Sequence, residues 1–177
     1  MIETQRLLLR KLTLDDLDGL FSILSDPQVS RYAGTGQPAT FEETRKALLS
    51  IIAHWERHGF GRWGIVDSQS NQLIGYGGLR SLLETPEVVY HFGSRHWGKG
   101  LATEMAHAAL RYGFEEHRFD RIVAIAMPAN AASIRVMQKI GMLYEMHTRY
   151  FDIDVIQYGI HRSQFHNGAA PYRLING

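Results

Sequence analysis

The segment from Arg95 to Ala102 holds the residues whose types and spacing point most directly to chemistry. Gly98 and Gly100 flank Lys99, and glycine tolerates both positive φ angles and the close approach of a ligand. A helical pattern begins immediately after this turn, so free backbone N–H groups at a helix N-terminus would be available to bind phosphate. We therefore expect a phosphorylated small molecule here, with Arg95 and Lys99 adding positive charge.

A second kind of phosphate-binding loop has a similar spacing. Residues Gly93 to Lys99 fit G-x-x-x-x-G-K, the opening of a P-loop that binds nucleoside triphosphates. The next residue of that motif is a serine or threonine that holds Mg²⁺, and Gly100 stands there instead. The loop also carries bulky residues such as Trp97, where a loop that wraps phosphate needs small ones. A P-loop-like nucleotide binder is therefore the weaker alternative, and a surface turn without a ligand is the other.

The hydrophobic pattern predicts the elements that position this loop, and together they indicate a mixed α+β fold with helices on both faces of a sheet. Thr40 and Glu43 form a capping box ahead of one helix. Strands are predicted at Leu7–Lys11, Trp63–Asp67, Gln72–Arg80, Val88–Phe92, Arg121–Ala126, Leu143–Phe151 and Val155–His161. Helices are predicted from a cap at Asp15 or Thr13 to about Leu24, and at Phe41–His58, Leu101–Glu116 and Ala131–Ile140. Hairpin turns are predicted at Ser68–Asn71 and Asp152–Asp154.

Three parts of the chain resemble one known family. Arg95, Gly98 and Gly100 fit Arg-x-x-Gly-x-Gly/Ala, which resembles the pyrophosphate loop of the GNAT (GCN5-related) acyltransferases. The segment from Asn130 to Met142 is similar to the family's Asn-x-x-Ser-x-x-Val-x-x-Lys-x-Gly-Phe/Met. The upstream segments look like the RimJ/RimL-like branch, and they are Thr4–Arg10, Leu14–Asp16, Asp26-Pro27 and Leu73–Leu79. The resemblance extends from about Glu3 to Phe165 in the family's order.

The resemblance implies a GNAT fold, with a central, mostly antiparallel, twisted sheet flanked by helices on both faces. It also implies an N-acetyltransferase that transfers an acetyl group from acetyl-CoA to a primary amine by direct attack in a ternary complex. The acceptor would be a protein N-terminal amine or a small-molecule amine. The residues expected at the acetyl-CoA site are Phe92, Arg95, Trp97, Gly98, Lys99, Gly100, Leu101, Ala102, Asn130 and Ser133.

Three acidic residues are candidates for the base that receives the amine proton. Glu87 comes just before the predicted strand that leads into the loop, three residues ahead of Tyr90, at a frequent acidic position of RimJ/RimL-like sequences. Strand geometry would let it face a cleft and act directly or through water. Asp152 follows the last helix at the distance where some relatives carry a base, although a hairpin-turn role is favoured. For Glu104, in the helix after the loop, a structural or solvent-facing role is favoured.

The candidate general acid departs from the family pattern. Many GNAT enzymes protonate the leaving thiolate with a tyrosine, and the matching position, counted from Asn130, is Met137. Ser133 is the best substitute, because relatives of this branch carry a serine there, near the sulfur. Asn130 would contact the pantetheine, cap the helix, or do both. The missing tyrosine leaves a second function open, a GNAT-fold module that binds acyl-CoA without transferring the acyl group.

The amino-acid composition limits the number of domains, the partners and the location that we expect. The 177 residues are 45% hydrophobic, so we expect one domain over residues 1–177, with a core at about 3–165 and a C-terminal tail at about 167–177 that frays. The net charge of +1 implies no nucleic-acid partner. The sequence has no cysteine, which excludes disulfides and thiolate zinc sites. It also lacks an apolar run of about 18 residues and a basic leader, so we expect neither a membrane partner nor secretion. We therefore expect a cytoplasmic protein, and a homodimer stays open.

A metal is not expected either. The histidines His54 and His58 are four residues apart and share a helix face, but they do not fit H-E-x-x-H and no third ligand suggests itself. A pair exposed to solvent is favoured over a metal site. His96, inside the loop, is expected to touch the coenzyme or solvent.

Overall fold

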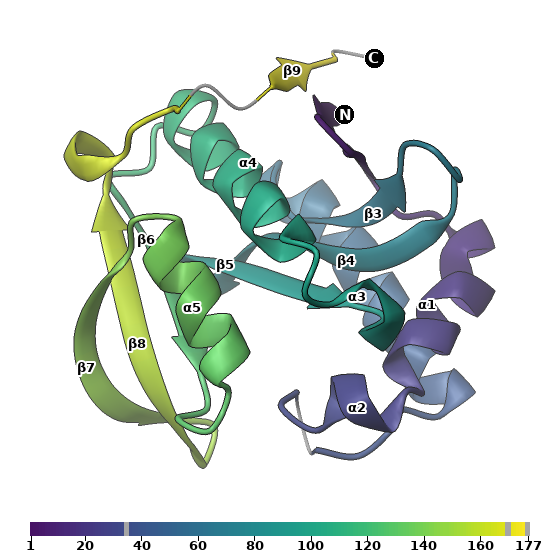
Figure 1. Cartoon of the computed structure of the whole chain (residues 1–177). Helices are drawn as coiled ribbons and strands as arrows, with labels where there is room; N and C mark the ends of the chain where they lie inside the picture. The colour runs from purple at the N-terminus through teal and green to yellow at the C-terminus, as the bar shows by residue number, and fades with distance from the viewer. Residues whose placement is uncertain (34–35, 169–170, 176–177) are drawn as a thin grey trace.

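The computed structural model describes residues 1–33, 36–168 and 171–175. Within these residues, nine strands form one sheet in the order β7-β8-β6-β5-β4-β3-β2-β1-β9 (Figure 1). Neighbouring strands are antiparallel except β5 and β6, which are parallel. The strands are β1 Ile2–Thr4, β2 Leu7–Arg10, β3 Arg62–Asp67, β4 Leu73–Leu82, β5 Thr85–Phe92, β6 Arg121–Ala126, β7 Leu143–Tyr150, β8 Ile153–His161 and β9 Tyr172–Leu174. The expected mixed α+β architecture is confirmed.

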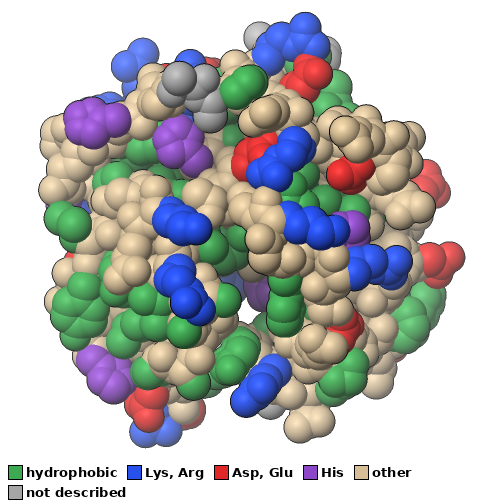
Figure 2. Space-filling model, viewed as in Figure 1, with side chains coloured by type: hydrophobic (Ala, Val, Ile, Leu, Met, Phe, Trp, Pro, Cys, Tyr) green, Lys and Arg blue, Asp and Glu red, His purple; other side chains and the backbone are tan. Residues whose placement is uncertain are grey.

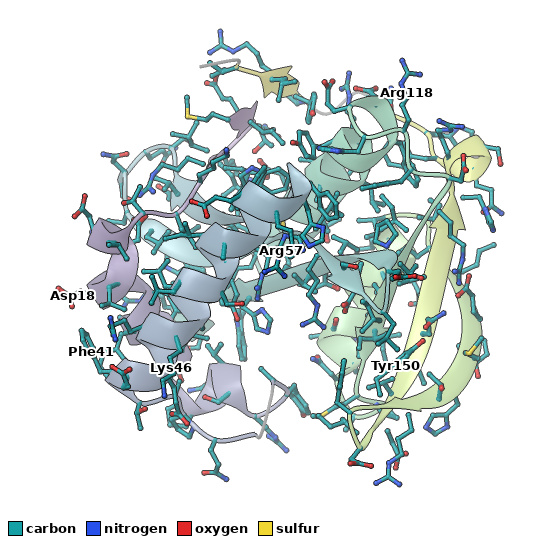
Figure 3. The ribbon with its side chains drawn as sticks, turned by 180° about the vertical axis from the view of Figure 1, so that it is seen from behind. Asp18, Phe41, Lys46, Arg57, Arg118 and Tyr150 are labelled. Atoms are coloured by element: carbon teal, nitrogen blue, oxygen red, sulfur yellow. The ribbon has the colours of Figure 1, made fainter. Side chains whose placement is uncertain are left out.

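Helices cover both faces of the sheet. The elements α4 and α5 lie in front of the sheet in Figure 1, whereas α3 lies in front when the molecule is seen from behind in Figure 3. The α-helices are α1 Leu17–Leu24, α2 Pro27–Ser30, α3 Phe41–His58, α4 Leu101–Glu115 and α5 Ala131–Lys139. Short 3₁₀ turns are η1 Leu14–Asp16, η2 Ser94–His96 and η3 Arg162–Gln164.

The helix α3 shows how directly local sequence sets an element. The Thr40 Oγ1 accepts a hydrogen bond from the Glu43 N–H, and the Glu43 carboxylate accepts one from the Thr40 N–H at 2.7 Å, which is the predicted capping box. The helix ends at Gly59, whose φ of 72° is in the left-handed region. Its apolar residues pack against the sheet, and Leu48 and Ile51 are almost fully buried.

The junction of β5 and β6 creates the space for a site. The two strands are paired at a single position, Glu87 with Val123. Beyond it, β5 continues to Phe92 on its pairing with β4 alone. The strands therefore separate in the middle of the sheet, and the segments that follow each strand, the η2 loop and the start of α5, lie on either side of the opening.

Three expectations need correction. The C-terminal tail does not simply fray, because Tyr172–Leu174 forms β9 and pairs with β1; residues 169–170 and 176–177 of that tail lie outside the described part. The strand β5 begins at Thr85, so Glu87 lies within it rather than before it. The last hairpin turns at Phe151 and Asp152, whose φ angles are 51° and 65°, and Tyr150 pairs with Ile153 across the turn.

Candidate functional site

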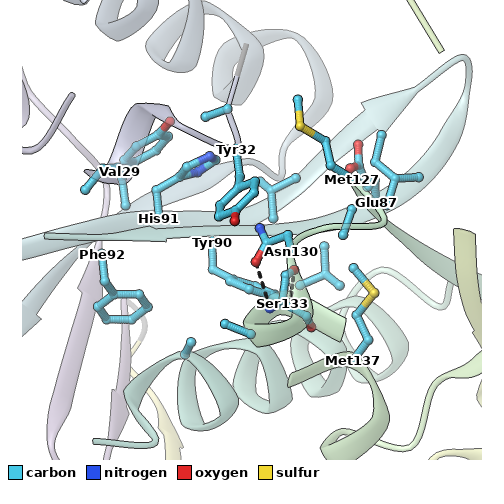
Figure 4. A pocket seen from close by; sticks show the side chains of 18 of the residues that line it. Val29, Tyr32, Glu87, Tyr90, His91, Phe92, Met127, Asn130, Ser133 and Met137 are labelled. Atoms are coloured by element: carbon cyan, nitrogen blue, oxygen red, sulfur yellow. Dashed lines mark hydrogen bonds between the residues drawn. The ribbon is translucent and has the colours of Figure 1, made fainter. Parts of the chain in front are cut away.

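A cavity of about 570 Å³ opens where β5 and β6 separate. It is bordered by β5, the segment after β6, the starts of α4 and α5, the β7–β8 turn and α2. Figure 4 shows that the cavity extends to both sides of β5, with Val29 and His91 on one side and Phe92 and Ser133 on the other. Two molecules could therefore approach the same opening from opposite faces of the sheet.

The predicted glycine turn lies at the start of α4. Gly98 and Gly100 have φ angles of 75° and 77°, a region that glycine adopts without strain. An added Cβ at Gly98 would meet nothing within 4 Å, and one at Gly100 would meet only an Arg6 nitrogen at 3.7 Å. The glycines are therefore needed for backbone conformation rather than for lack of space inside the protein.

The turn leaves backbone donors free. Among the described residues, the N–H groups of Gly98, Lys99 and Gly100 find no acceptor, and Gly100 caps α4 without a side-chain hydrogen bond. The first N–H groups of α4 add further donors, because the first turn of any helix lacks partners for them. Unpaired N–H groups at the positive end of a helix dipole form an anion site, which fits the pyrophosphate of coenzyme A.

Arg6 holds this turn in place, a role that the sequence did not reveal. Its Nη1 donates to the Lys99 carbonyl oxygen at 2.9 Å, and its Nε donates to Glu104 Oε2 at 2.7 Å. Thr4 Oγ1 donates to the other oxygen of Glu104 at 2.7 Å. The structural role expected for Glu104 is thus confirmed, because its carboxylate joins β1 and the following turn to α4.

Positive charge lies next to the turn. The side chains of Arg95 and Lys99 are exposed, and neither forms an ion pair within the described part of the chain. Burial and then these two cations lower the pKa of His96, so its ring is neutral at pH 7. Figure 2 shows Lys and Arg side chains on both sides of a hollow in this face. The charges suit a ligand that carries several phosphates.

The start of α5 brings Asn130 and Ser133 to the cavity, as the sequence predicts. Asn130 Oδ1 accepts a hydrogen bond from the Ser133 N–H at 3.1 Å, so the predicted helix-capping role is confirmed. Tyr90 reaches Ser133 from β5, with its hydroxyl 3.0 Å from Ser133 Oγ and 3.1 Å from the Ser133 carbonyl oxygen. Burial raises the pKa of Tyr90 to about 12, so the phenol stays protonated at pH 7. Met137 is 1% exposed and offers no proton.

Glu87 lies in the same cavity but is held by an arginine. Its side chain is 1% exposed, and its Oε2 accepts a hydrogen bond from Arg80 Nε at 2.6 Å. The two residues face each other on paired strands. Burial raises the pKa of Glu87, and the hydrogen bond to Arg80 opposes that rise. The carboxyl group is therefore a better proton acceptor than an exposed glutamate, although its charge is already shared with a cation.

Sequence reasoning missed several polar residues of the cavity, among them Arg62, Tyr76, Arg80 and His91. His91 stacks on Tyr76, with ring centroids 4.8 Å apart and an interplanar angle of 5°. Burial and then the charges of Arg62 and Arg80 lower the pKa of His91 to about 4, and its Nδ1 is buried without a partner in the described residues. The only available signal was the alternation of side chains along β5, which puts Glu87 and His91 on one face.

Asp152 and Tyr144 lie outside the cavity, whereas Tyr150, on the same hairpin, lines it. Asp152 occupies the tight β7–β8 turn with a side chain that is 97% exposed, so the favoured turn role is confirmed. Tyr144 is 57% exposed and packs edge-on against Tyr158. Tyr150 does line the cavity, where its hydroxyl donates to Gln157 at 2.8 Å.

The histidine pair on α3 is not fully exposed to solvent as expected, because His54 is partly buried and hydrogen-bonded, whereas His58 is exposed. His54 Nδ1 lies 2.9 Å from the Phe60 carbonyl oxygen, and the Ser81 N–H donates to His54 Nε2 at 3.3 Å. The described ranges contain no group of three or more His, Cys, Asp or Glu side chains that could hold a metal ion. They also contain no helix that is both long and apolar enough to cross a membrane.

All the residues predicted to bind the coenzyme line the cavity except Arg95 and Lys99, which point to solvent beside it. The structure therefore brings together a phosphate-binding turn, the Tyr90–Ser133 pair and Glu87 around one opening. A thiol ester could lie in this opening with its phosphates on the turn, and an amine could reach it from the other face of β5.

Comparisons with known proteins agree with this geometry. The sequence model of the family described as "Acetyltransferase (GNAT) domain" matches residues 6–143. The uncharacterized N-acetyltransferase YoaA of Bacillus subtilis is 28% identical over 175 residues, which cover 97% of this chain and 92% of YoaA. A GNAT-family acetyltransferase from Bacillus anthracis has a similar crystal structure, with a TM-score of 0.80, 29% identity, and coverage of 92% of this chain and 98% of that one.

A more distant structure shares the fold. The spermidine N-acetyltransferase of Vibrio cholerae, solved in complex with CoA and spermine, has a TM-score of 0.74 at 22% identity, with coverage of 90% of this chain and 97% of that one. The matched family model spans most of the chain and includes the strands β5 and β6, between which the cavity opens. The chain therefore belongs to the GNAT acetyltransferases and is an acetyl-CoA-dependent acyltransferase.

Proposed function

We propose that this protein transfers an acetyl group from acetyl-CoA to a primary amine by direct attack within a ternary complex. The observation that carries the proposal is that the phosphate-binding turn at the start of α4 and the Tyr90–Ser133 pair border one cavity with the carboxyl group of Glu87. A thioester donor and an amine acceptor need these three features together: an anion site, a hydrogen-bond donor for the leaving sulfur and a proton acceptor.

The α4 turn would bind the pyrophosphate of acetyl-CoA. The unpaired N–H groups of Gly98, Lys99 and Gly100 would donate to the phosphate oxygens, with Arg95 and Lys99 adding charge at the rim. Phe92, Trp97 and Ala126 would contact the pantetheine along the opening between β5 and β6. When bound, acetyl-CoA supplies the activated acetyl group.

The amine must lose a proton before it attacks. At pH 7, a lysine-like amine with a pKa of about 10.4 is less than about 1% neutral, and an α-amine with a pKa of about 7.7–8 is roughly 10–15% neutral. Glu87 is the proposed proton acceptor, either directly or through one water, because it is the single carboxylate among the described residues that line the cavity. The raised pKa of its carboxyl group favours this role.

The thiolate of coenzyme A must be stabilised as the carbon–sulfur bond breaks. Ser133 Oγ is the proposed donor, and Tyr90 stabilises it through the 3.0 Å hydrogen bond. The pKa of Tyr90 is about 12, well above the value of about 8.5 for a cysteine thiol. Full proton transfer from the phenol would thus be unfavourable, so the pair acts by hydrogen bonding. The proton that finally reaches the sulfur comes from the ammonium group of the acceptor, through Glu87 or solvent.

One observation favours a second function. Met137 stands where the resemblance to GNAT enzymes places a proton-donating tyrosine, and it is buried. A protein of this fold that holds acyl-CoA and does not transfer the acyl group would tolerate that change. The Tyr90–Ser133 pair supports the catalytic function instead, because Tyr90 on β5 brings a tyrosine hydroxyl to Ser133 on α5.

An acceptor screen separates the two functions. Purified protein is incubated with acetyl-CoA and a panel of amino acids, peptides, polyamines and drug-like amines, and mass spectrometry identifies acetylated products while a thiol reagent measures free CoA. We expect release of CoA that depends on the amine, with a product 42 Da heavier, the mass that one acetyl group adds in place of hydrogen. Tight binding of acetyl-CoA with no acetylated product across the panel would support the binding module.

A further inference from the structure

One wall of the cavity is positively charged. Arg62 on β3 and Arg80 on β4 lie beside Glu87 and His91 on β5, and all four line the cavity. Arg80 is paired with Glu87, and Arg62 is paired with Gly78, which is itself paired with Val89, so the two arginines lie at positions on the same face of the sheet as Glu87 and His91. Figure 4 shows Glu87 and His91 on one side of β5 and Ser133 on the other.

The charges on this wall do not cancel. The described residues that line the cavity include two arginines, Arg62 and Arg80, and one carboxyl group, that of Glu87, whereas the lowered pKa values of His91 and His96 favour neutral rings. Glu87 is occupied by its hydrogen bond to Arg80 at 2.6 Å. One positive charge is therefore left over.

That charge belongs to Arg62. Its guanidinium makes no hydrogen bond or ion pair with another described side chain, and burial lowers its pKa from the ordinary value of 12.5. A buried guanidinium stays charged in proteins and favours a planar, two-oxygen partner. A carboxylate is such a partner, whereas a second ammonium group on the acceptor would be repelled.

We propose that the acceptor is a small amine that also carries a carboxylate, and that Arg62 binds this carboxylate. The inference rests on the proposed acetyl transfer and names its substrate class. The acceptor amine would lie toward Glu87 and the opening between β5 and β6. Apolar side chains on the same side of the cavity, including Val29, Tyr32 and Val89, would contact the rest of the molecule. Polyamines, which carry several positive charges, would be poor acceptors.

Binding of product-like probes tests the carboxylate site without requiring turnover. Calorimetry in the presence of CoA compares N-acetyl-L-leucine with N-acetyl-L-leucinamide, which has the same shape and no carboxylate. We expect the wild-type protein to bind the carboxylate about 10- to 100-fold more tightly, as expected for a hydrogen bond between charged groups. Arg62→Gln should abolish this preference, and Arg62→Lys should restore part of it. Equal binding of the two probes to the wild-type protein would overturn the proposal.

A matched control guards against a general effect of removing an arginine. Arg118 is exposed, does not line the cavity, and lies at the end of the molecule away from Tyr150, which does (Figure 3). Arg118→Gln should keep the wild-type preference for the carboxylate. Melting temperatures of all variants show whether they fold, and the Arg62→Lys result holds even if the glutamine variant is unstable.

Turnover separates this inference from the proposed function. Values of kcat/KM are measured for leucine, leucinamide and spermidine, with leucine expected to exceed leucinamide by about 10-fold or more and to lose that advantage in Arg62→Gln. If spermidine is the best acceptor, the carboxylate proposal is wrong and acetyl transfer stands. If no amine is acetylated, the proposed function fails, and the calorimetry still decides whether Arg62 binds a carboxylate.

Discussion

Substituting Gly100 tests whether the turn before α4 binds the phosphates of acetyl-CoA. Its φ of 77° can be adopted by asparagine and aspartate at modest cost, and an added Cβ would meet only an Arg6 nitrogen at 3.7 Å. Gly100→Asn and Gly100→Asp therefore place side chains of the same shape at the turn and differ only in charge. The asparagine variant controls for backbone strain.

The size of the effect follows from the charge. For an aspartate at roughly 5 Å from two phosphate charges, with an effective dielectric constant of about 40, the repulsion is about 3 kcal/mol, or about 100-fold in affinity. The same negative charge is favourable by about 0.3–1 kcal/mol at the start of a helix without ligand. The aspartate variant should thus be at least as stable as the asparagine variant on its own and bind acetyl-CoA far more weakly.

Thermal unfolding reads out both effects. At about 100 times its Kd, acetyl-CoA adds about 2.7 kcal/mol of stability, which for a chain of this size raises Tm by about 5–11 °C. After a 100-fold loss of affinity, the same concentration adds about 0.4 kcal/mol and raises Tm by about 1 °C. Calorimetry confirms the affinities directly. Wild-type affinity in Gly100→Asp would show that the phosphates do not lie at this turn.

Three further substitutions test the chemistry and the charge of the cavity. Ser133→Ala should slow the chemical step about 10- to 100-fold in single-turnover experiments and leave acetyl-CoA affinity unchanged; an unaltered rate would show that Ser133 does not stabilise the leaving thiolate. Glu87→Gln should lower kcat/KM most at low pH, and the deficit should shrink as the pH approaches the amine's own pKa, because the substrate then arrives neutral. A deficit that stays flat from about pH 6 to about pH 10 would indicate a structural role instead. His91 has a folded-state pKa of about 4 against an ordinary 6.5, so the unfolded chain binds the proton more readily and stability falls as the pH drops between these values, by up to about 3 kcal/mol. His91→Phe keeps a ring to stack on Tyr76 and should remove that part of the acid destabilisation in urea unfolding at about pH 7 and about pH 4.5; an identical pH dependence in both proteins would contradict a buried, neutral imidazole.

The elements that follow from local signals were predicted well from the sequence. The capping box of Thr40 and Glu43 and the left-handed Gly59 bound α3 as expected, because caps depend on residues only a few positions apart. The glycine turn after β5 was found for the same reason, since Gly98 and Gly100 both need positive φ angles. Such signals are complete within a short window of sequence.

Features that depend on distant partners could not be predicted in this way. The strand β9 exists because Tyr172–Leu174 pairs with β1 at the other end of the chain, and three residues carry too little periodicity to reveal a strand. Glu87 was predicted to lie just before a strand that begins at Val88, yet it lies within β5 because residues 85–87 pair with the end of β4, where Arg80 lies opposite Glu87. The anchoring of the phosphate-binding turn by Arg6 likewise spans 93 residues.

The residues of the cavity likewise divide into those that a short stretch of sequence reveals and those that only the fold brings together. Asn130 and Ser133 were recognised because their segment resembles a GNAT motif, whereas the Tyr90 hydroxyl that meets Ser133 comes from β5. Likewise, the charged wall that includes Arg62 forms only when three strands lie side by side. Chemistry that gathers residues from several strands needs the fold before it can be recognised.

The central claim, transfer of acetyl from acetyl-CoA to an amine within one ternary complex, is tested most directly by following both products in one reaction. The best acceptor from the screen is mixed with isotopically labelled acetyl-CoA, and quenched samples are analysed by mass spectrometry for the acceptor, free CoA and the intact protein. The account predicts that labelled acetyl-amine and free CoA appear in equal amounts and that no label is ever found on the protein, which contains no cysteine. Labelled protein that forms before the product, or bound acetyl-CoA that is never consumed, would contradict it.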